Sequence, residues 1–177
     1  LHSGVERVVY ASSSSLYGNA ERYPTSEDDV PAPFSPYGVT KLAAEHLCRL
    51  YSSNFGLHTV SLRYFTVFGP RQRPDLAMMK LIESALEGTP FPLYGTGEQI
   101  RDFTFVDDVV DATARSGLET VEPGSVFNVA GGSPATMNEV VEIVTRLTGG
   151  ALQVERQDAV PGDVARTGGA TERIASA

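Results

Sequence analysis

Two residues with complementary acid–base chemistry, Tyr37 and Lys41, lie four positions apart in the segment YGVTK at 37–41. On a helix they share one face, one turn apart. A tyrosine phenol has a pKa near about 10 and is a poor base at neutral pH. A cation held beside it favours the phenolate, which could then accept a proton from a substrate. The same spacing is also typical of an ordinary helix start with a half-buried tyrosine and a solvated lysine.

A run of four serines, Ser12 to Ser15, precedes this segment, and Ser13 lies 24 residues before Tyr37. The run follows a β-branched and aromatic stretch at 7–11 that indicates a buried parallel strand. Doubly wound sheets bind ligands at the carboxyl ends of such strands. Ser13 could therefore hydrogen-bond the oxygen whose proton Tyr37 removes, although a serine-rich turn explains the run equally well.

The remaining pattern indicates the elements that would position these residues. We expect strands at 7–11, 59–65, 91–94 and 126–130, and helices at 37–55, 75–87 and 106–118. Thr136 and Glu139 predict the capping box of a further helix ending at Gly149. Residues 18–36 indicate a surface excursion in which 27–29 form a solvated acidic loop, and no closing element is expected after 162. Alternating strands and helices predict an α/β fold with a parallel sheet.

Composition narrows the possible partners. The chain has 177 residues, 41% of them hydrophobic, and a net charge of −8, which argues against a nucleic-acid or anionic-membrane surface. No apolar run is long enough for a membrane span. Cys48 is the only cysteine, which favours a cytoplasmic location. The spacing of the three histidines suggests no metal site.

Four motifs in order resemble one family. They are Ser-x-x-x-Tyr-Gly from 13, Ser-Pro-Tyr-Gly-x-x-Lys from 35, LRYFTVFGP at 62–70 and Arg-Asp-Phe at 101–103. Together they resemble the extended short-chain dehydrogenase/reductase family, and within it the UDP-sugar 4-epimerases. The resemblance runs from Val5 to about Asp163 and lacks the family's Gly-x-x-Gly-x-x-Gly turn. We therefore expect a chain truncated at both ends, without the adenosine-binding half.

The resemblance implies an incomplete doubly wound, Rossmann-like parallel sheet with a smaller α/β substrate-binding lobe. Residues 1–70 would be the second part of the Rossmann domain. Residues 71–177 would form mainly the substrate lobe, with 101–130 returning to the Rossmann sheet. The implied cofactor is NAD, the implied substrate a UDP-sugar, and the implied assembly a homodimer.

The resemblance also implies roles for the matching positions. Tyr37 would be the acid/base at the sugar 4-hydroxyl, Lys41 would hold the nicotinamide ribose, and Ser13 would bridge tyrosine and substrate. The implied cofactor contacts are Ala11, Ser12, Tyr37, Lys41, Tyr64, Phe65 and Val67. The implied substrate contacts are Ser13, Ser14, Ser15, Thr66, Arg73, Tyr94, Arg101 and Asp163. Among these, Tyr94 would pack on the uracil, Arg101 would pair with the diphosphate, and Asp163 would accept from the uridine ribose.

The residues after Ser13 help to choose the reaction. The family's dehydratases carry Asp-Glu where this chain has Ser14 and Ser15, and its decarboxylases usually carry Glu at the position of Ser15. Their absence favours epimerisation at C4 through a transient 4-keto sugar. A reductase that releases its ketosugar, or an inactive fragment, remains an alternative.

Substrate choice stays open between two sugars. The serines, Thr66 and Arg73 are similar to those of UDP-glucuronate 4-epimerases, and a guanidinium matches a carboxylate in bidentate geometry. The preference would be strong if Arg73 is buried, because a buried arginine without an anion is costly. If Arg73 is instead solvent-exposed or reaches the diphosphate, as in a UDP-glucose epimerase, we expect both sugars to be accepted.

Overall fold

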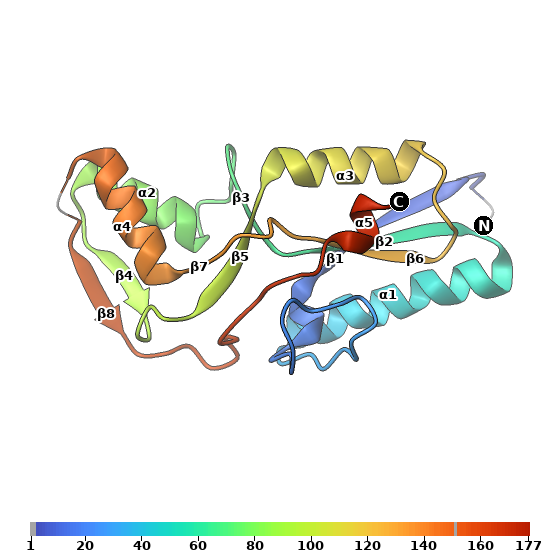
Figure 1. Ribbon diagram of the computed structural model, residues 1–177, viewed down its shortest axis with the longest axis horizontal. Coiled ribbons are helices and arrows are strands. Elements are labelled where there is room, and N and C mark those ends of the chain that lie inside the picture. Colours follow the sequence, from blue (N-terminus) through green and yellow to red (C-terminus); the bar gives the residue numbers. More distant parts are fainter. Residues whose placement is uncertain (1–2, 151) are drawn as a thin grey trace.

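The computed structural model describes residues 3–150 and 152–177, arranged as an elongated α/β molecule (Figure 1). In the first half lie β1 (Arg7–Ser13), the 3-10 helix η1 (Ser14–Tyr17), α1 (Pro36–Phe55), β2 (His58–Tyr64), β3 (Thr66–Phe68) and α2 (Ala77–Glu87). In the second half lie β4 (Phe91–Tyr94), β5 (Ile100–Phe105), α3 (Val106–Leu118), β6 (Ser125–Val129), β7 (Pro134–Thr136), α4 (Met137–Thr148), β8 (Val154–Gln157) and α5 (Glu172–Ala175). In the described ranges, no helix is long and apolar enough to cross a membrane.

A three-stranded parallel sheet in the order β1-β2-β6 forms one half of the molecule. Helix α1 covers one face of this sheet and α3 covers the other (Figure 1). Alternate residues of β2 point to opposite faces, so Val60 and Leu62 enter the apolar cluster under α3 while Arg63 points to α1. Helices on both faces of a parallel sheet confirm the predicted Rossmann-like α/β class.

Helix α1 is bounded by strong local signals. Ser35 caps its start, because its side chain accepts a hydrogen bond from the backbone N–H of Gly38 at 3.1 Å. Pro36 occupies the first helical position, where its missing N–H costs nothing. Gly56 ends the helix with φ 66°, a left-handed conformation that glycine adopts without strain. The predicted helix is confirmed, and Tyr37 lies in its first turn.

The other half packs α2 and α4 against short strands. Strands β4 and β8 pair in parallel, and β5 lies between β3 and β7. The buried cluster there consists of Leu81, Phe91, Leu93, Met137, Val140 and Val144. The predicted capping box of α4 is present, with Thr136 and Glu139 bonded reciprocally. The division of the chain into two domains near residue 70 stays a prediction.

Residues 18–36, hereafter the strap, differ from the expectation of a simple surface excursion. Thr25 donates its N–H to the carbonyl of Gly168 at 2.7 Å and accepts the N–H of Ala170 at 2.9 Å. The Glu27 carboxylate is 3% exposed and accepts the N–H of Asn128 at 2.8 Å. The solvated-loop prediction was therefore wrong for Glu27. A run of carboxylates in sequence does not reveal that Asn128, a hundred residues away, satisfies one of them.

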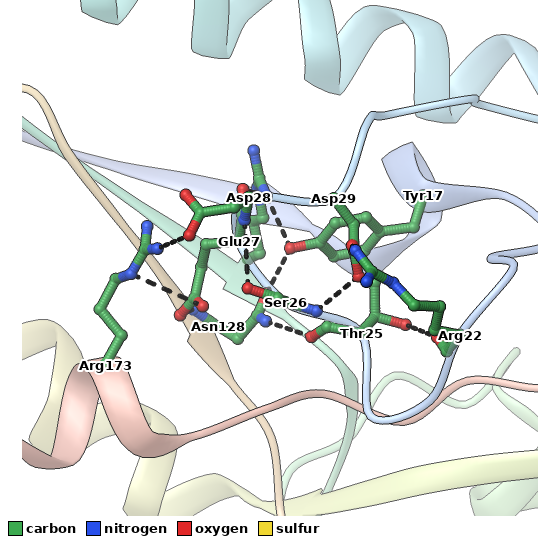
Figure 2. A network of polar contacts seen from close by, with 10 residues as sticks. Tyr17, Arg22, Thr25, Ser26, Glu27, Asp28, Asp29, Asn128 and Arg173 are labelled. Atoms are coloured by element: carbon green, nitrogen blue, oxygen red, sulfur yellow. Dashed lines mark hydrogen bonds and ion pairs between the residues drawn. The ribbon is translucent and has the colours of Figure 1, made fainter.

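Figure 2 shows how the strap meets the C-terminal segment. Arg173 of α5 pairs with the exposed Asp28 at 2.5 Å and lies 3.8 Å from the Glu27 carboxylate. Within the strap, Arg22 pairs with Asp29. The hydrogen bond from Ser26 N–H and the one from Arg22 together lower the pKa of Asp29. The strap is thus held to the C-terminal segment through Glu27 and Asp28, and the Arg22–Asp29 pair stabilises its own turn.

Candidate active site

Tyr37 and Lys41 lie on one face of α1, as their spacing predicts. The Lys41 Nζ lies 5.4 Å from the centroid of the Tyr37 ring and 5.4 Å from that of Tyr10. The ammonium also donates to the carbonyl oxygen of Ala11 at 2.9 Å, which ties the helix to the end of β1. Tyr37 is 56% exposed, so its phenol is accessible to a ligand. The arrangement provides a reachable hydroxyl beside a fixed cation.

The serine turn lies directly against the start of α1. Ser13 Oγ accepts the N–H of Ser15 at 3.2 Å, and the two hydroxyls are 2.8 Å apart. Gly38 packs so closely on this turn that an added Cβ would lie 2.6 Å from the Ser15 carbonyl oxygen. Glycine after Tyr37 therefore permits the helix to approach the serines. The structure thus brings Tyr37, Lys41 and the Ser13–Ser15 hydroxyls into one region.

Two of the expected cofactor contacts have their polar groups engaged within the protein. Ser12 is 2% exposed, and its hydroxyl donates to Glu45 Oε2 at 2.9 Å, so this hydroxyl is not free for a ligand. The Ala11 carbonyl accepts from Lys41. Sequence reasoning missed Glu45, although its position four residues after Lys41 places it on the same helix face.

The segment after β2 is largely packed into the protein. The Tyr64 hydroxyl lies 2.7 Å from Thr113 Oγ1 of α3. Phe65 is 6% exposed, in a cluster with Leu16 and Tyr17. Val67 packs on the α3 side of the sheet. Roles for these residues beside a nicotinamide stay predictions, as does that of Thr66, which pairs with Phe103 of β5.

Arg73 is exposed, contrary to the burial on which the argument for a strong glucuronate preference depended. Its side chain is 73% exposed and forms a bidentate pair with Asp75, Nε to Oδ1 at 3.0 Å and Nη2 to Oδ2 at 2.5 Å. The hydrogen bond that Arg73 donates to Asp75, together with the Asp75 charge, raises the pKa of Arg73. An exposed guanidinium carries little desolvation cost, so burial supplies no selectivity.

The two expected contacts to the nucleotide, Arg101 and Asp163, contact each other. Arg101 Nη2 lies 2.5 Å from Asp163 Oδ1, and the two side chains are 14% and 46% exposed. The neighbouring Asp102 is 1% exposed and accepts three backbone N–H groups, from Gly131, Gly132 and Gly169. Tyr94 is half-exposed at the end of β4, in the β4–β8 sheet, whereas Arg101 lies on β5 in the β3-β5-β7 sheet.

Comparison with known proteins identifies the family. Residues 1–130 match the model of the NAD dependent epimerase/dehydratase family, so the chain belongs to that family. This agrees with the family resemblance inferred from the motifs. A curated relative, an uncharacterized UDP-glucose epimerase YtcB of Bacillus subtilis, is 39% identical over 92% of this chain and 51% of its own length. The chain spans about half the length of the curated relatives it matches.

Solved structures give the same result. MoeE5, in complex with UDP-glucuronic acid and NAD, is 44% identical with a TM-score of 0.94, and the alignment covers 99% of this chain and 59% of MoeE5. MoeE5 has also been solved with UDP-glucose and NAD. The UDP-glucuronic acid 4-epimerase of Bacillus cereus, with UDP-glucuronic acid and NAD, is 39% identical with a TM-score of 0.93, covering 99% and 56% of the two chains. The chain is therefore similar to solved UDP-sugar 4-epimerases.

Proposed function

We propose that the intact protein interconverts UDP-sugars epimeric at C4, with NAD as cofactor, and that UDP-glucuronate is favoured over UDP-glucose. The observation that carries the proposal is the exposed Tyr37 phenol beside Lys41, with the Ser13–Ser15 hydroxyls packed against the same helix turn. Relatives solved with NAD and UDP-sugars support the cofactor and the substrate class.

The residues of this chain suit both halves of such a reaction. The Tyr37 phenolate accepts the proton of the sugar 4-hydroxyl, and Ser13 donates a hydrogen bond to the same oxygen. Bound NAD would supply the acceptor for the C4 hydride and the donor for its return. After the ketosugar has rotated in the site, Tyr37 returns the proton to the C4 oxygen. The opposite epimer is then formed with no net oxidation. Lys41 stabilises the phenolate in both steps.

The groups near Tyr37 fit the ribose of a nicotinamide nucleotide. The Lys41 ammonium has three N–H donors, of which the bond to Ala11 uses one. The remaining donors suit the vicinal hydroxyls of a ribose. Elimination of water, as in the related dehydratases, would need a carboxylic acid and base in the serine turn, where Ser14 and Ser15 supply only hydroxyls.

In this proposal, UDP-glucuronate is preferred because its sugar carboxylate can replace Asp75 as the partner of Arg73. Arg73 pairs with Asp75 in an exposed bidentate contact, and the sugar carboxylate offers the guanidinium the same geometry. Because the existing pair is solvent-exposed and weakly held, breaking it costs little. The preference should therefore be moderate rather than absolute, and UDP-glucose remains the second substrate.

The homodimer expected from the family is also proposed, through α1. The exposed side of this helix carries an apolar stripe, which consists of Val39, Leu47, Leu50, Tyr51 and Phe55. Tyr51 and Phe55 stack with ring centroids 5.2 Å apart. A second copy packing the same stripe in two-fold fashion would remove it from water.

The test of the proposed reaction is Tyr37→Phe in the intact protein. The change keeps the ring and removes the transferable proton, so kcat should fall about a hundredfold to ten-thousandfold while UDP-sugar affinity holds. Tyr51→Phe, a hydroxyl deletion on the same helix about four turns away, is the control and should retain turnover. Activity of Tyr37→Phe within threefold of the parent would exclude Tyr37 as the acid/base.

A further inference from the structure

The buried side of α1 carries a carboxylate, Glu45, whose two oxygens are both engaged. Oε1 accepts from Arg63 Nη2 at 2.5 Å, and Oε2 accepts from Arg63 Nε at 3.1 Å and from Ser12 Oγ at 2.9 Å. Glu45 is 2% exposed and Arg63 is 4% exposed. The three residues therefore form an enclosed polar contact between the helix and two strands.

Burying an ion pair such as Glu45–Arg63 in the protein interior costs free energy. Removing two charges from water costs energy that their attraction offsets only when the geometry is good, and apolar side chains of similar volume are often equally stable. A bidentate guanidinium–carboxylate contact differs from apolar packing because it fixes direction and distance. The distinctive contribution of Glu45 and Arg63 is therefore alignment of the elements that carry them.

On the helix, Glu45 shares a face with the proposed catalytic groups. It lies one turn beyond Lys41 and two turns beyond Tyr37, at four-residue intervals. Lys41 ties the same face of α1 to β1, because its ammonium donates to the Ala11 carbonyl oxygen at 2.9 Å. Helix α1 is thus tied to the sheet at two successive turns, directly behind Tyr37.

On the sheet, Glu45 holds the strand ends that lead into the site. Ser12 immediately precedes Ser13 on β1. Arg63 reaches onward, with Nη1 donating to the Tyr17 hydroxyl at 2.6 Å and to the Glu27 carbonyl at 3.1 Å. Burial alone would lower the pKa of Arg63, but the hydrogen bond to Glu45 and the neighbouring Tyr17 raise it, so the guanidinium stays charged.

We propose that Glu45 is a positioning residue that sets the Tyr37 phenol and the Lys41 ammonium against Ser13, acting through Ser12 and Arg63. The inference rests on the proposed function, because it concerns how that site is aligned. Loosening the contact lets the first turns of α1 shift relative to β1. A small misplacement of reacting groups lowers turnover steeply while leaving binding of the distant nucleotide intact.

The test uses two hydroxyl deletions in the intact protein. Ser12→Ala removes the bond between β1 and Glu45 and keeps the charge pair. Thr59→Val is the matched control, since Thr59 is also 2% exposed and also ties the sheet to α1, donating to the Cys48 carbonyl at 3.1 Å. Both deletions should lower the melting temperature by similar small amounts.

The two variants should differ in catalysis. Ser12→Ala should lower kcat roughly tenfold, with KM for the UDP-sugar within twofold. Ser12→Thr, which keeps the hydroxyl, should restore kcat, and Thr59→Val should match the parent. Equal behaviour of Ser12→Ala and Thr59→Val would overturn the proposal.

A double variant, Glu45→Leu with Arg63→Met, separates alignment from stability. It fills the interior and leaves no lone buried charge, but the Ser12 hydroxyl and the Glu27 carbonyl each lose a hydrogen bond, so it should stay folded with a moderately lower melting temperature and lose turnover. Parent-like turnover in a folded double variant would also overturn the positioning role. Tyr37→Phe measured alongside keeps the hypotheses apart: its retention of activity would refute the proposed reaction, whereas its inactivity beside a normal Ser12→Ala would refute only the role of Glu45.

Discussion

Asp102→Asn tests whether a single buried carboxylate joins three distant segments. The Asp102 Oδ1 accepts from the N–H groups of Gly131 and Gly132, each at 3.0 Å, and Oδ2 accepts from Gly169 at 3.1 Å. These bonds connect β5 to the turn after β6 and to the segment that pairs with the strap. Asparagine preserves the shape, but it replaces one acceptor oxygen by an NH₂ group and removes the charge.

The expected loss of stability follows from these contacts. The amide oxygen can face Gly131 and Gly132, which leaves the amide nitrogen against the Gly169 N–H. One hydrogen bond to a charged group is lost, worth about 1.5–3 kcal/mol, and a buried donor remains unsatisfied at a further cost of about 1–3 kcal/mol. The free energy of unfolding should fall by roughly 2.5–6 kcal/mol, and Tm by roughly 5–24 °C for a chain of this size.

Thermal unfolding followed by circular dichroism measures the change, and hydrogen exchange at the Gly169 amide locates it. Asp158→Asn makes the same chemical change at an exposed carboxylate and should leave Tm unaltered. A shift under 2 °C for Asp102→Asn, or an equal shift for Asp158→Asn, would refute the reasoning.

Three further predictions concern the substrate, the assembly and pH. Arg73→Ala should lower kcat/KM for UDP-glucuronate more than for UDP-glucose, and Asp75→Asn should shift the ratio the other way by removing a competing carboxylate; equal effects on both sugars would exclude Arg73 as a carboxylate contact. Leu47→Glu, in the apolar stripe of α1, should yield a monomer in sedimentation experiments, and an unchanged mass would exclude that interface. Burial raises the pKa of Tyr17 from 10.0 to about 12, so its contribution to stability is complete below pH 10 and is lost as pH rises towards 12. Tyr17→Phe should make denaturant midpoints less sensitive to pH in that window, and an equally steep decline would contradict this.

Local signals explain which elements could be predicted from the sequence. Pro36 and Gly56 delimit α1, and the Thr136–Glu139 pair marks the start of α4, because caps act through neighbouring backbone groups. Strand β8 could not be predicted, since all four of its residues are exposed and show no alternation. It exists because β4 offers a pairing edge, which is a tertiary cause.

The candidate site also contains features that local sequence signals predict and features that depend on tertiary contacts. The Tyr37–Lys41 spacing is local and predicted their shared face correctly. The exposure of Arg73 and the contact between Arg101 and Asp163 depend on residues that approach only in the folded chain. Glu45 was detectable by its four-residue interval from Lys41, but its partner Arg63 stands out only as a charged residue inside an apolar strand.

The strap also makes contacts that can form only after a long further stretch of the chain has been synthesised. The Tyr23 hydroxyl bonds to the carbonyl of Arg166, 143 residues later in the chain. At about 5–20 residues per second, a ribosome needs roughly 7–30 s to make the intervening residues. Throughout that interval the strap lacks its contacts with residues 166–173, although β1, α1 and β2, which carries Arg63, have already been made. The strap of the nascent chain is therefore held by fewer contacts until residues 166–173 have been made, and during that period a chaperone or a protease would bind it.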